Sequence, residues 1–286
     1  MQNNRRKIFV ITFLLLVSCA VCIAARGQQT NSLAKVFGSI QSGQIEVVDL
    51  THPLDEQSPY WPEGDAPSPF HARTAATYDH DGYFARNLEL PEHFGTHMDA
   101  PAHFDPKGLT LDQIPPKLFL RTAIVVDVSE SVKTNPDFRV EVEDLKAWEK
   151  AHGRMPSGCV VFFRTGWSSR WPSQKNYMNQ DAQGVLHFPG LGIEAARYLL
   201  DRAHPVAIGI DTGSIDYGPS KNFEVHHLTM SAGLYHLENL ANLERLPATG
   251  AYIVALPMKL RGGSGSPTRV LALTPKMKDR KMETRK

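Results

Sequence analysis

A run of eleven residues, 93–103, constrains this chain more than any other feature, because it places three histidines and one aspartate at odd-numbered positions. These residues are His93, His97, Asp99 and His103. In an extended chain, side chains alternate between two faces, so all four would share one face. Gly95 and Pro101 argue against the alternative of a helix, since glycine weakens a helix interior and proline removes a backbone donor.

The same run predicts a metal site on a bent strand or loop. Residues four apart on a straight strand lie about 13 Å apart at roughly 3.3 Å per residue, which is too far for two imidazoles to bind one ion. We therefore expect a bend at Gly95. Imidazole and carboxylate together suit a borderline divalent ion such as zinc or manganese. Any single histidine is more often an ordinary polar residue, but this density favours a metal site.

The pattern His-x-Gly-Thr-His-x-Asp-x-Pro-x-His resembles the signature of the cyclase-like metal hydrolases, which include bacterial kynurenine formamidase and isatin hydrolase. The resemblance extends from about Val47 to Leu273. Further segments that resemble the family are 59–62, 164–167, 209–216, 225–227 and 237–240. The resemblance implies an α/β fold, a single swivelling β/β/α cyclase-like domain, and a homodimer.

The resemblance also implies a ligand set for two divalent ions, zinc or manganese. His93, His97 and Asp99 match ligands of a first ion, and Asp99 matches a carboxylate that bridges to a second. His226 matches a ligand of the second ion, and Glu238 matches a second bridging carboxylate. Isatin hydrolases resemble this pattern but carry an amide in place of Glu238 and bind one manganese. The carboxylate therefore favours the formamidase side of the family.

The implied activity is metal-dependent hydrolysis of a small aromatic amide, as in the conversion of N-formyl-kynurenine to kynurenine and formate. His103 matches the acid/base residue, which would take a proton from the attacking water and give it to the leaving amine. Trp61 matches an aromatic residue of the substrate pocket. Tyr83 and Phe84 could complete the pocket wall or pack in the core. Two alternatives stay open: a hydrolase of cyclic amides or lactones of the isatin hydrolase type, and a non-catalytic exported metal- or ligand-binding protein.

Several other polar residues are less defined by their positions. Asp211 and Asp216 follow a predicted strand and either orient a ligand histidine or form turns and caps. His227 is the alternative to His226, although the spacing favours His226. His52, after the first predicted strand, either approaches the site or is a polar surface residue, and the surface role is favoured. No spacing argument supports His71, His80, His152, His187, His204 or His236.

Composition and patterning bound the architecture. The chain has 286 residues, 42% of them hydrophobic, which suffices for one domain, predicted at 45–275. A polar lead-in with a short helix precedes it at 26–44, and a basic tail follows at 276–286. The predicted strands are 45–50, 84–90, 122–128, 160–164, 206–210, 234–238, 252–257 and 269–273, and the main helices are 142–152 and 192–202. A formal net charge of +1 indicates no nucleic-acid partner.

Residues 1–25 look like a signal peptide, with a positive start, an apolar stretch and small residues at the end. We expect export to the periplasm or the medium after cleavage. The alternatives are a lipid anchor at Cys19 and a retained membrane helix, since about 17 apolar residues lie at the lower limit for a span. Only Cys159 would remain in the mature domain, within an apolar run typical of a buried, inert thiol.

Overall fold

The computed structural model describes residues 32–62 and 68–276. The chain divides into two compact units, residues 1–46 and 47–286. In the first unit, residues 32–41 form a helix, as expected for the polar lead-in. The predicted leader at 1–25 lies outside the described residues, and so does all of the basic tail after residue 276. Over the described ranges, no helix has both the length and the apolar character that a membrane span needs.

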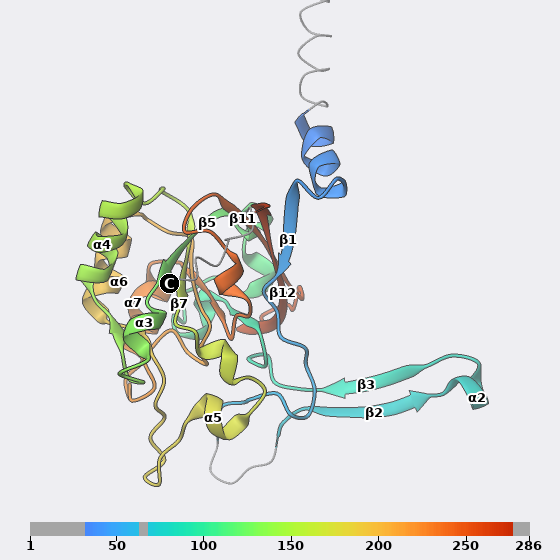
Figure 1. Cartoon of the computed structure of the whole chain (residues 1–286). Coiled ribbons are helices and arrows are strands. Elements are labelled where there is room, and N and C mark those ends of the chain that lie inside the picture. Colours follow the sequence, from blue (N-terminus) through green and yellow to red (C-terminus); the bar gives the residue numbers. More distant parts are fainter. Residues whose placement is uncertain (1–31, 63–67, 277–286) are drawn as a thin grey trace, which may run out of the picture. The chain divides into compact units, whose positions relative to one another are not determined.

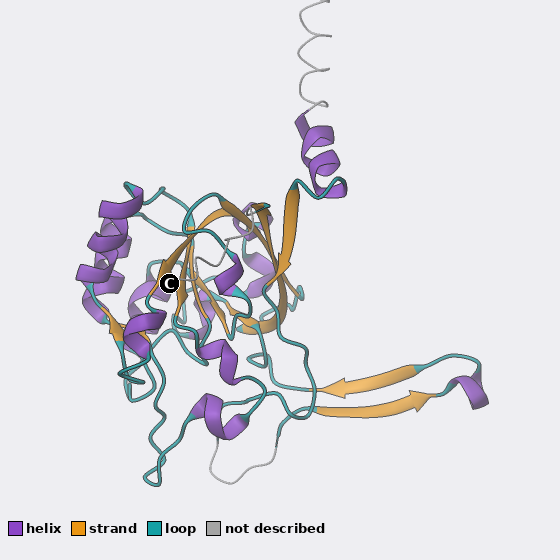
Figure 2. Cartoon of the chain, in the orientation of Figure 1, coloured by secondary structure: helices purple, strands orange, loops and turns teal. Residues whose placement is uncertain are grey.

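The second unit is built around a mixed sheet that closes on itself (Figures 1 and 2). Its strands are β1 (Ile45–Asp49), β4 (His97–Asp99), β5 (Leu120–Asp127), β7 (Val160–Arg164), β9 (Ala207–Ile210), β10 (Tyr235–Glu238), β11 (Ala251–Pro257) and β12 (Gly265–Pro275). They follow the order β1-β12-β11-β5-β7-β9-β10-β4, and β4 pairs with β12 as well as with β10. This second pairing closes a barrel-like ring, with β1 as an added strand beside β12.

Smaller elements surround the ring. They are β2 (His71–Ala76), β3 (Ala85–Glu89), β6 (Arg139–Val140), β8 (Gly190–Leu191), α2 (Tyr78–Asp81), α3 (Ser129–Val132), α4 (Val142–His152), α5 (Gln174–Met178), α6 (Ile193–Arg202) and α7 (Glu224–Ser231). Among the described strands, β2 and β3 pair only with each other, and this ribbon projects from the rest of the unit with α2 at its tip (Figure 1).

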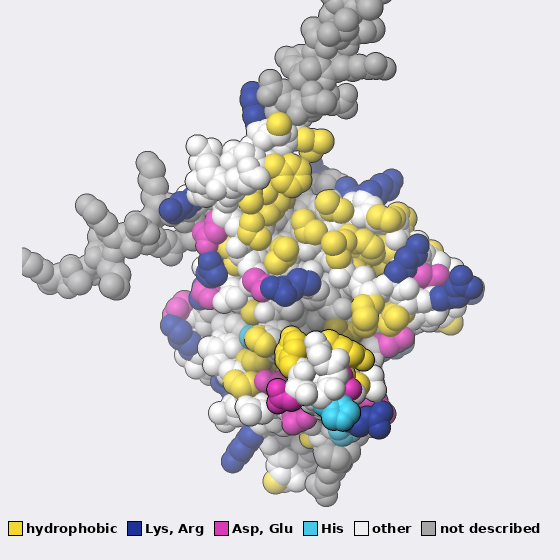
Figure 3. All heavy atoms as spheres, turned by 90° about the vertical axis from the view of Figure 1, so that its right-hand side faces the viewer, with side chains coloured by type: hydrophobic (Ala, Val, Ile, Leu, Met, Phe, Trp, Pro, Cys, Tyr) yellow, Lys and Arg dark blue, Asp and Glu magenta, His cyan; other side chains and the backbone are white. Residues whose placement is uncertain are grey.

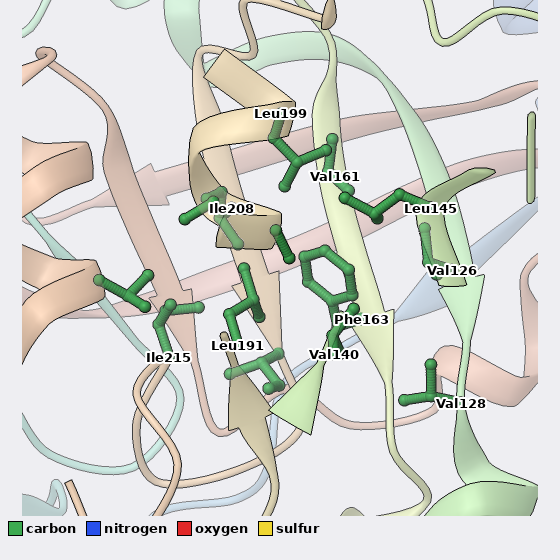
Figure 4. Packing of buried hydrophobic residues seen from close by; sticks show 14 of the residues in the cluster. Val126, Val128, Val140, Leu145, Val161, Phe163, Leu191, Leu199, Ile208 and Ile215 are labelled. Carbon is green, nitrogen blue, oxygen red and sulfur yellow. The ribbon is translucent and has the colours of Figure 1, made fainter. Parts of the chain in front are cut away.

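Central strands of the ring are buried on both faces, which explains their continuous apolar sequence. On β7, Val161 and Phe163 pack against the layer of α4 and α6, where Leu145 and Leu199 meet them (Figure 4). Phe162 belongs to the other cluster, which includes residues of β4, β10 and β12. Because β7 is held from both sides, the ring provides a rigid frame for the residues that it carries.

The predicted helices and strands agree closely with the observed ones where the local hydrophobic pattern is strong. α4 and β7 have the predicted bounds, and Cys159 is buried, with its thiol pKa raised to about 11 by burial. β12 begins four residues before the predicted 269 because its first residues pair with β4, a long-range contact that the local sequence does not encode.

Tyr83 and Phe84 were expected in the pocket wall or the core. Both are exposed beside the β2–β3 ribbon, so both expectations were wrong.

Candidate metal centre and pocket

Two neighbouring strands place four ligand-type side chains together. β4 and β10 pair antiparallel, with His236 opposite Asp99 and Glu238 opposite His97. Side chains two apart on a strand point to the same face, and directly opposite residues share a face. All four therefore meet on one side of the sheet, and all four are buried.

The bend predicted at Gly95 brings His93 to the same place. Gly95 has a φ of +61°, a left-handed conformation that glycine adopts without steric cost. His93 Nδ1 then lies 2.6 Å from Asp99 Oδ1, and His97 Nε2 lies 3.1 Å from the same oxygen. The ring of His93 passes over Gly265 of β12, where an added Cβ would approach it to 2.4 Å. His93, His97 and Asp99 thus form one cluster that could hold an ion.

A second cluster shares the Asp99 carboxylate. Its members are Asp99, His226, His236 and Glu238, all buried, with candidate ligand atoms within 4.8 Å of one another. His226 comes from α7, and its Nε2 lies 3.3 Å from Glu238 Oε1 and 3.7 Å from Asp99 Oδ2. Glu238 also reaches the first cluster, since its Oε2 lies 3.6 Å from His97 Nε2. Both carboxylates therefore lie between the two groups of histidines.

The outer nitrogens of the histidines are held by acceptors. His97 Nδ1 donates to the Gly95 carbonyl at 2.9 Å, and His226 Nδ1 donates to Asp216 Oδ2 at 2.7 Å. Such bonds fix the ring orientation and leave the other nitrogen free for a metal. Asp216 also accepts from the backbone N–H of Val225 and His226, so it caps α7 as well as orienting a ligand-type histidine.

His93 is held in the same way through a hydroxyl. Ser264 Oγ donates to Glu92 Oε2 at 2.8 Å and lies 3.0 Å from His93 Nε2. Because the single hydroxyl proton goes to the carboxylate, His93 Nε2 is the donor to Ser264. Nδ1, the nitrogen that lies beside Asp99, is therefore the one left to bind an ion next to that carboxylate.

The charges in the cluster compensate one another. Burial alone would raise the pKa of Asp99, but His97 and the bonds from His226 and His93 hold it well below its usual range. Burial would lower the pKa of His97, but Asp99 and Glu238 raise it to about 9. A metal ion would take the place of such protons, because it binds the neutral imidazole.

The residues present fit a divalent ion. Imidazole nitrogens and carboxylate oxygens are the usual donor set for zinc, and they suit manganese as well. Asp99 Oδ2 and His236 Nδ1 are buried yet lack a hydrogen-bond partner among the described residues. Buried polar atoms are normally paired, so two unpartnered atoms at the centre of the cluster fit a bound cation.

Five of the cluster residues line a cavity of about 490 Å³ whose lining includes several aromatic rings: His93, His97, Asp99, His226 and Glu238. The apolar part of the lining includes Pro59, Tyr60, Trp61, Phe94, Phe104, Met178 and Phe223. His103 also lines the cavity, and its ring stacks on His93 with the centroids 3.9 Å apart. Trp61 is 42% exposed and contacts Phe188 and Phe223 edge-on or tilted, so part of its face stays open to the cavity.

The seven residues predicted from the sequence therefore meet at one site, and the sequence missed one. His236 was set aside for want of a spacing argument, but it lies two residues before Glu238 on the same face of β10. That spacing of two was the available signal. His227 is exposed, in contrast to the buried His226. Asp211 accepts hydrogen bonds from Thr165 and Gly166 in the loop after β7, and among the described residues it orients no ligand-type histidine.

His52 also differs from its prediction as a polar surface residue. Its ring stacks on Trp171 at 4.3 Å, and burial lowers its pKa to about 4. The ring is therefore a half-buried packing group rather than a solvated surface side chain.

Comparison with known proteins identifies the family. The family model described as "Putative cyclase" matches residues 48–217. The chain belongs to the cyclase family. Isatin hydrolase of Roseibium aggregatum is 35% identical to this cyclase over 86% of the chain and 98% of the relative. Kynurenine formamidase of Paracidovorax citrulli is 29% identical over 79% and 96%. The solved structure of isatin hydrolase A from Ralstonia solanacearum superposes with a TM-score of 0.81, at 37% identity, over 85% of this chain and 97% of that one.

The chain is therefore a metal-dependent hydrolase of this family, with the predicted α/β fold. The alternative of a non-catalytic metal- or ligand-binding protein is no longer favoured, because the relatives that span nearly the whole domain are hydrolases.

Replacing His97 tests the ligand set. His97→Ala removes the ring nitrogen that lies between Asp99 and Glu238. We expect the affinity for Mn²⁺ or Zn²⁺ to fall by about 100-fold or more, which is more than the loss of a hydrogen-bond partner behind a ligand histidine causes. Metal per chain after dialysis, measured by plasma mass spectrometry, checks this. His152→Ala changes an exposed histidine on α4 and serves as the control. Equal metal content in the two variants would exclude His97 as a ligand.

Proposed function

We propose that this enzyme hydrolyses the amide C–N bond of a small aromatic compound at the centre described above. The observation that carries the proposal is that residues of both clusters line one cavity of about 490 Å³ together with several aromatic side chains. Cavities of roughly 300–1,000 Å³ accept small organic ligands and align them through a few polar groups. A planar aromatic amide would place its ring between the aromatic walls and its carbonyl at the clusters.

Two ions per chain fit the arrangement better than one. His93 and His97 would hold one ion and His226 the other, with Asp99 and Glu238 shared between them. The supporting observation is that each carboxylate presents one oxygen to each group of histidines. Bound zinc or manganese supplies Lewis acidity, which polarises a carbonyl and lowers the pKa of water, to about 7 in favourable zinc sites.

His103 is the proton carrier in this proposal. Its ring lines the cavity beside His93, and burial lowers its pKa to about 4, against the opposing pull of Asp99. The imidazole is therefore neutral at pH 7 and can accept a proton from water at the start of the reaction. The imidazolium then donates that proton to the leaving amine nitrogen. Trp61 would stack on the aromatic ring of the substrate and hold the carbonyl in place.

Two substrate classes each have one observation in their favour. An open-chain formamide of the N-formyl-kynurenine type is favoured by Glu238, the carboxylate that resembles the formamidases. A cyclic amide of the isatin type is favoured by the higher identity to isatin hydrolase, 35% against 29%. The reaction at the carbonyl is the same in both, and the amine leaves as a separate product only from the open-chain amide.

A substrate panel with a His103 variant tests the proposal. We expect the Mn²⁺- or Zn²⁺-loaded enzyme to hydrolyse N-formyl-kynurenine, isatin or a related aromatic amide, and the chelated enzyme to be inactive. His103→Ala should lower kcat by about 10²–10⁴-fold, the usual contribution of a general acid–base. Its metal content should match the wild type. Full activity of verified metal-free protein would refute the mechanism, and loss of metal from His103→Ala would make His103 a ligand instead.

We further infer a homodimer, with the β2–β3 ribbon as its contact surface. Within the described residues, the ribbon hydrogen-bonds to no further strand, and an isolated two-stranded ribbon is at best marginally stable in water. Its four large hydrophobic side chains are more than half exposed: Tyr78, Tyr83, Phe84 and Leu88. Figure 3 looks at this end of the ribbon and shows hydrophobic side chains open to solvent. A second copy of the chain would bury this surface, as exposed apolar patches of this kind mark interfaces.

Light scattering on the purified protein checks the dimer. We expect twice the mass of the chain for the wild type, and the monomer mass for the double variant Tyr78→Ser, Phe84→Ser, whose rings stack on each other at the tip of the ribbon. Tyr252→Ser changes a comparably exposed side chain on β11 and should leave the mass unchanged. A monomeric wild type would rule out the dimer.

Export through residues 1–25 stays a prediction from the sequence, supported by the positive start and apolar stretch of that segment. N-terminal analysis of the mature protein checks it. We expect an N-terminus close after Ala25, whereas a lipidated N-terminus at Cys19 or an intact Met1 would support one of the two membrane-anchored alternatives.

A further inference from the structure

His236 is the one member of the second cluster that the family resemblance leaves without a role. Its side chain is fully buried on β10, opposite Asp99 and two residues before Glu238. Its ring meets that of His226 edge-on, with the centroids 4.7 Å apart. A buried imidazole at such a position needs partners for both of its nitrogens.

The proton of His236 can be placed from its neighbours. Thr229 Oγ1 lies 2.7 Å from the carbonyl oxygen of Val225 and 2.7 Å from His236 Nε2. A hydroxyl has one proton, and a carbonyl oxygen can only accept, so Thr229 donates to Val225. His236 Nε2 must then carry the hydrogen that binds Thr229. The other ring nitrogen, Nδ1, is left with an unshared electron pair.

That electron pair faces a carboxylate. His236 Nδ1 lies 4.0 Å from Asp99 Oδ2, and neither atom has a hydrogen-bond partner among the described residues. Two acceptors that face each other in a buried site repel, and each has lost its hydration. A proton between them would need a separation of about 2.7–3.2 Å. The observed separation of 4.0 Å is too long for such a hydrogen bond. Two metal–ligand bonds of about 2.0–2.1 Å each, made to one ion between the two atoms, can span it.

We propose that His236 is a further metal ligand, binding the second ion through Nδ1 beside Asp99, His226 and Glu238. The second ion then has four protein ligands from three elements, β4, α7 and β10. Thr229 on α7 is the positioning residue that fixes the tautomer of His236. The proposal rests on the two-ion centre under "Proposed function" and adds a ligand to it.

Metal stoichiometry tests the ligand. Chelated protein is titrated with Mn²⁺ by calorimetry, and metal per chain is counted after dialysis. We expect two ions for the wild type and one for His236→Gln, with the affinity for the second ion lowered at least about 10-fold. His52→Gln is the matched control, because His52 also has a ring nitrogen without a partner in the described part of the chain but stacks on Trp171 outside the cluster. It should retain both ions.

A second variant keeps the test decisive if His236→Gln does not fold. Thr229→Val preserves the side-chain shape and His236 itself but removes the acceptor for Nε2–H. We expect the second ion to bind about 10–100-fold more weakly, the usual effect of losing the outer partner of a ligand histidine. Wild-type affinity for both ions in either folded variant would overturn the proposal, and so would a single ion in the wild type.

Parallel assays with the amide panel separate this proposal from the proposed function. If the wild type hydrolyses an amide while His236→Gln retains both ions, His236 is not a ligand and the function stands. If the ion count falls from two to one but the wild type hydrolyses none of the panel compounds, the ligand assignment stands and the proposed function fails.

Discussion

Two buried carboxylates, Asp99 and Glu238, determine how the rest of the site is built. They are 1% and 4% exposed, and isolated carboxylates at such positions would be far too costly to keep ionised. Each is therefore surrounded by imidazoles, which reach it from β4, from α7 and from the loop before β4. Protons on those imidazoles balance the charge without metal, and a divalent ion can replace them. The site is thus stable enough to fold and still favours a cation.

The closed ring of strands makes this burial possible. Because β4 pairs with β10 on one side and β12 on the other, its two ligand-type residues are held by hydrogen-bonded neighbours on both sides. Around this rigid base, the outer partners of the histidines come from four separate segments, at Gly95, Asp216, Thr229 and Ser264. The aromatic cavity above is less regular, and its walls come from loops and helix ends. Such a division lets loops set the substrate while the strands preserve the chemistry.

Much of the fold and of the site could be predicted from the sequence where the sequence pattern was local. The bounds of α4 and β7 followed from hydrophobic periodicity, and the bend at Gly95 followed from the clash between ligand spacing and strand geometry. The ligand-type residues followed from the motif and the family resemblance. The exposed positions of Tyr83 and Phe84 could not be predicted. Aromatic residues in a β-rich segment give the same sequence pattern whether their side chains are buried in the core or lie on an exposed surface.

By itself, the sequence determined the chemistry: three histidines and an aspartate in one bent segment, a family signature, and the residue types that a metal hydrolase needs. Only the tertiary structure decided how these groups divide between two clusters. That division depends on the register of β4 against β10, which sets His236 opposite Asp99. It depends also on the hydroxyl of Thr229, which decides the nitrogen that His236 presents. Both are contacts between segments distant in sequence or across a turn, and no local pattern encodes them.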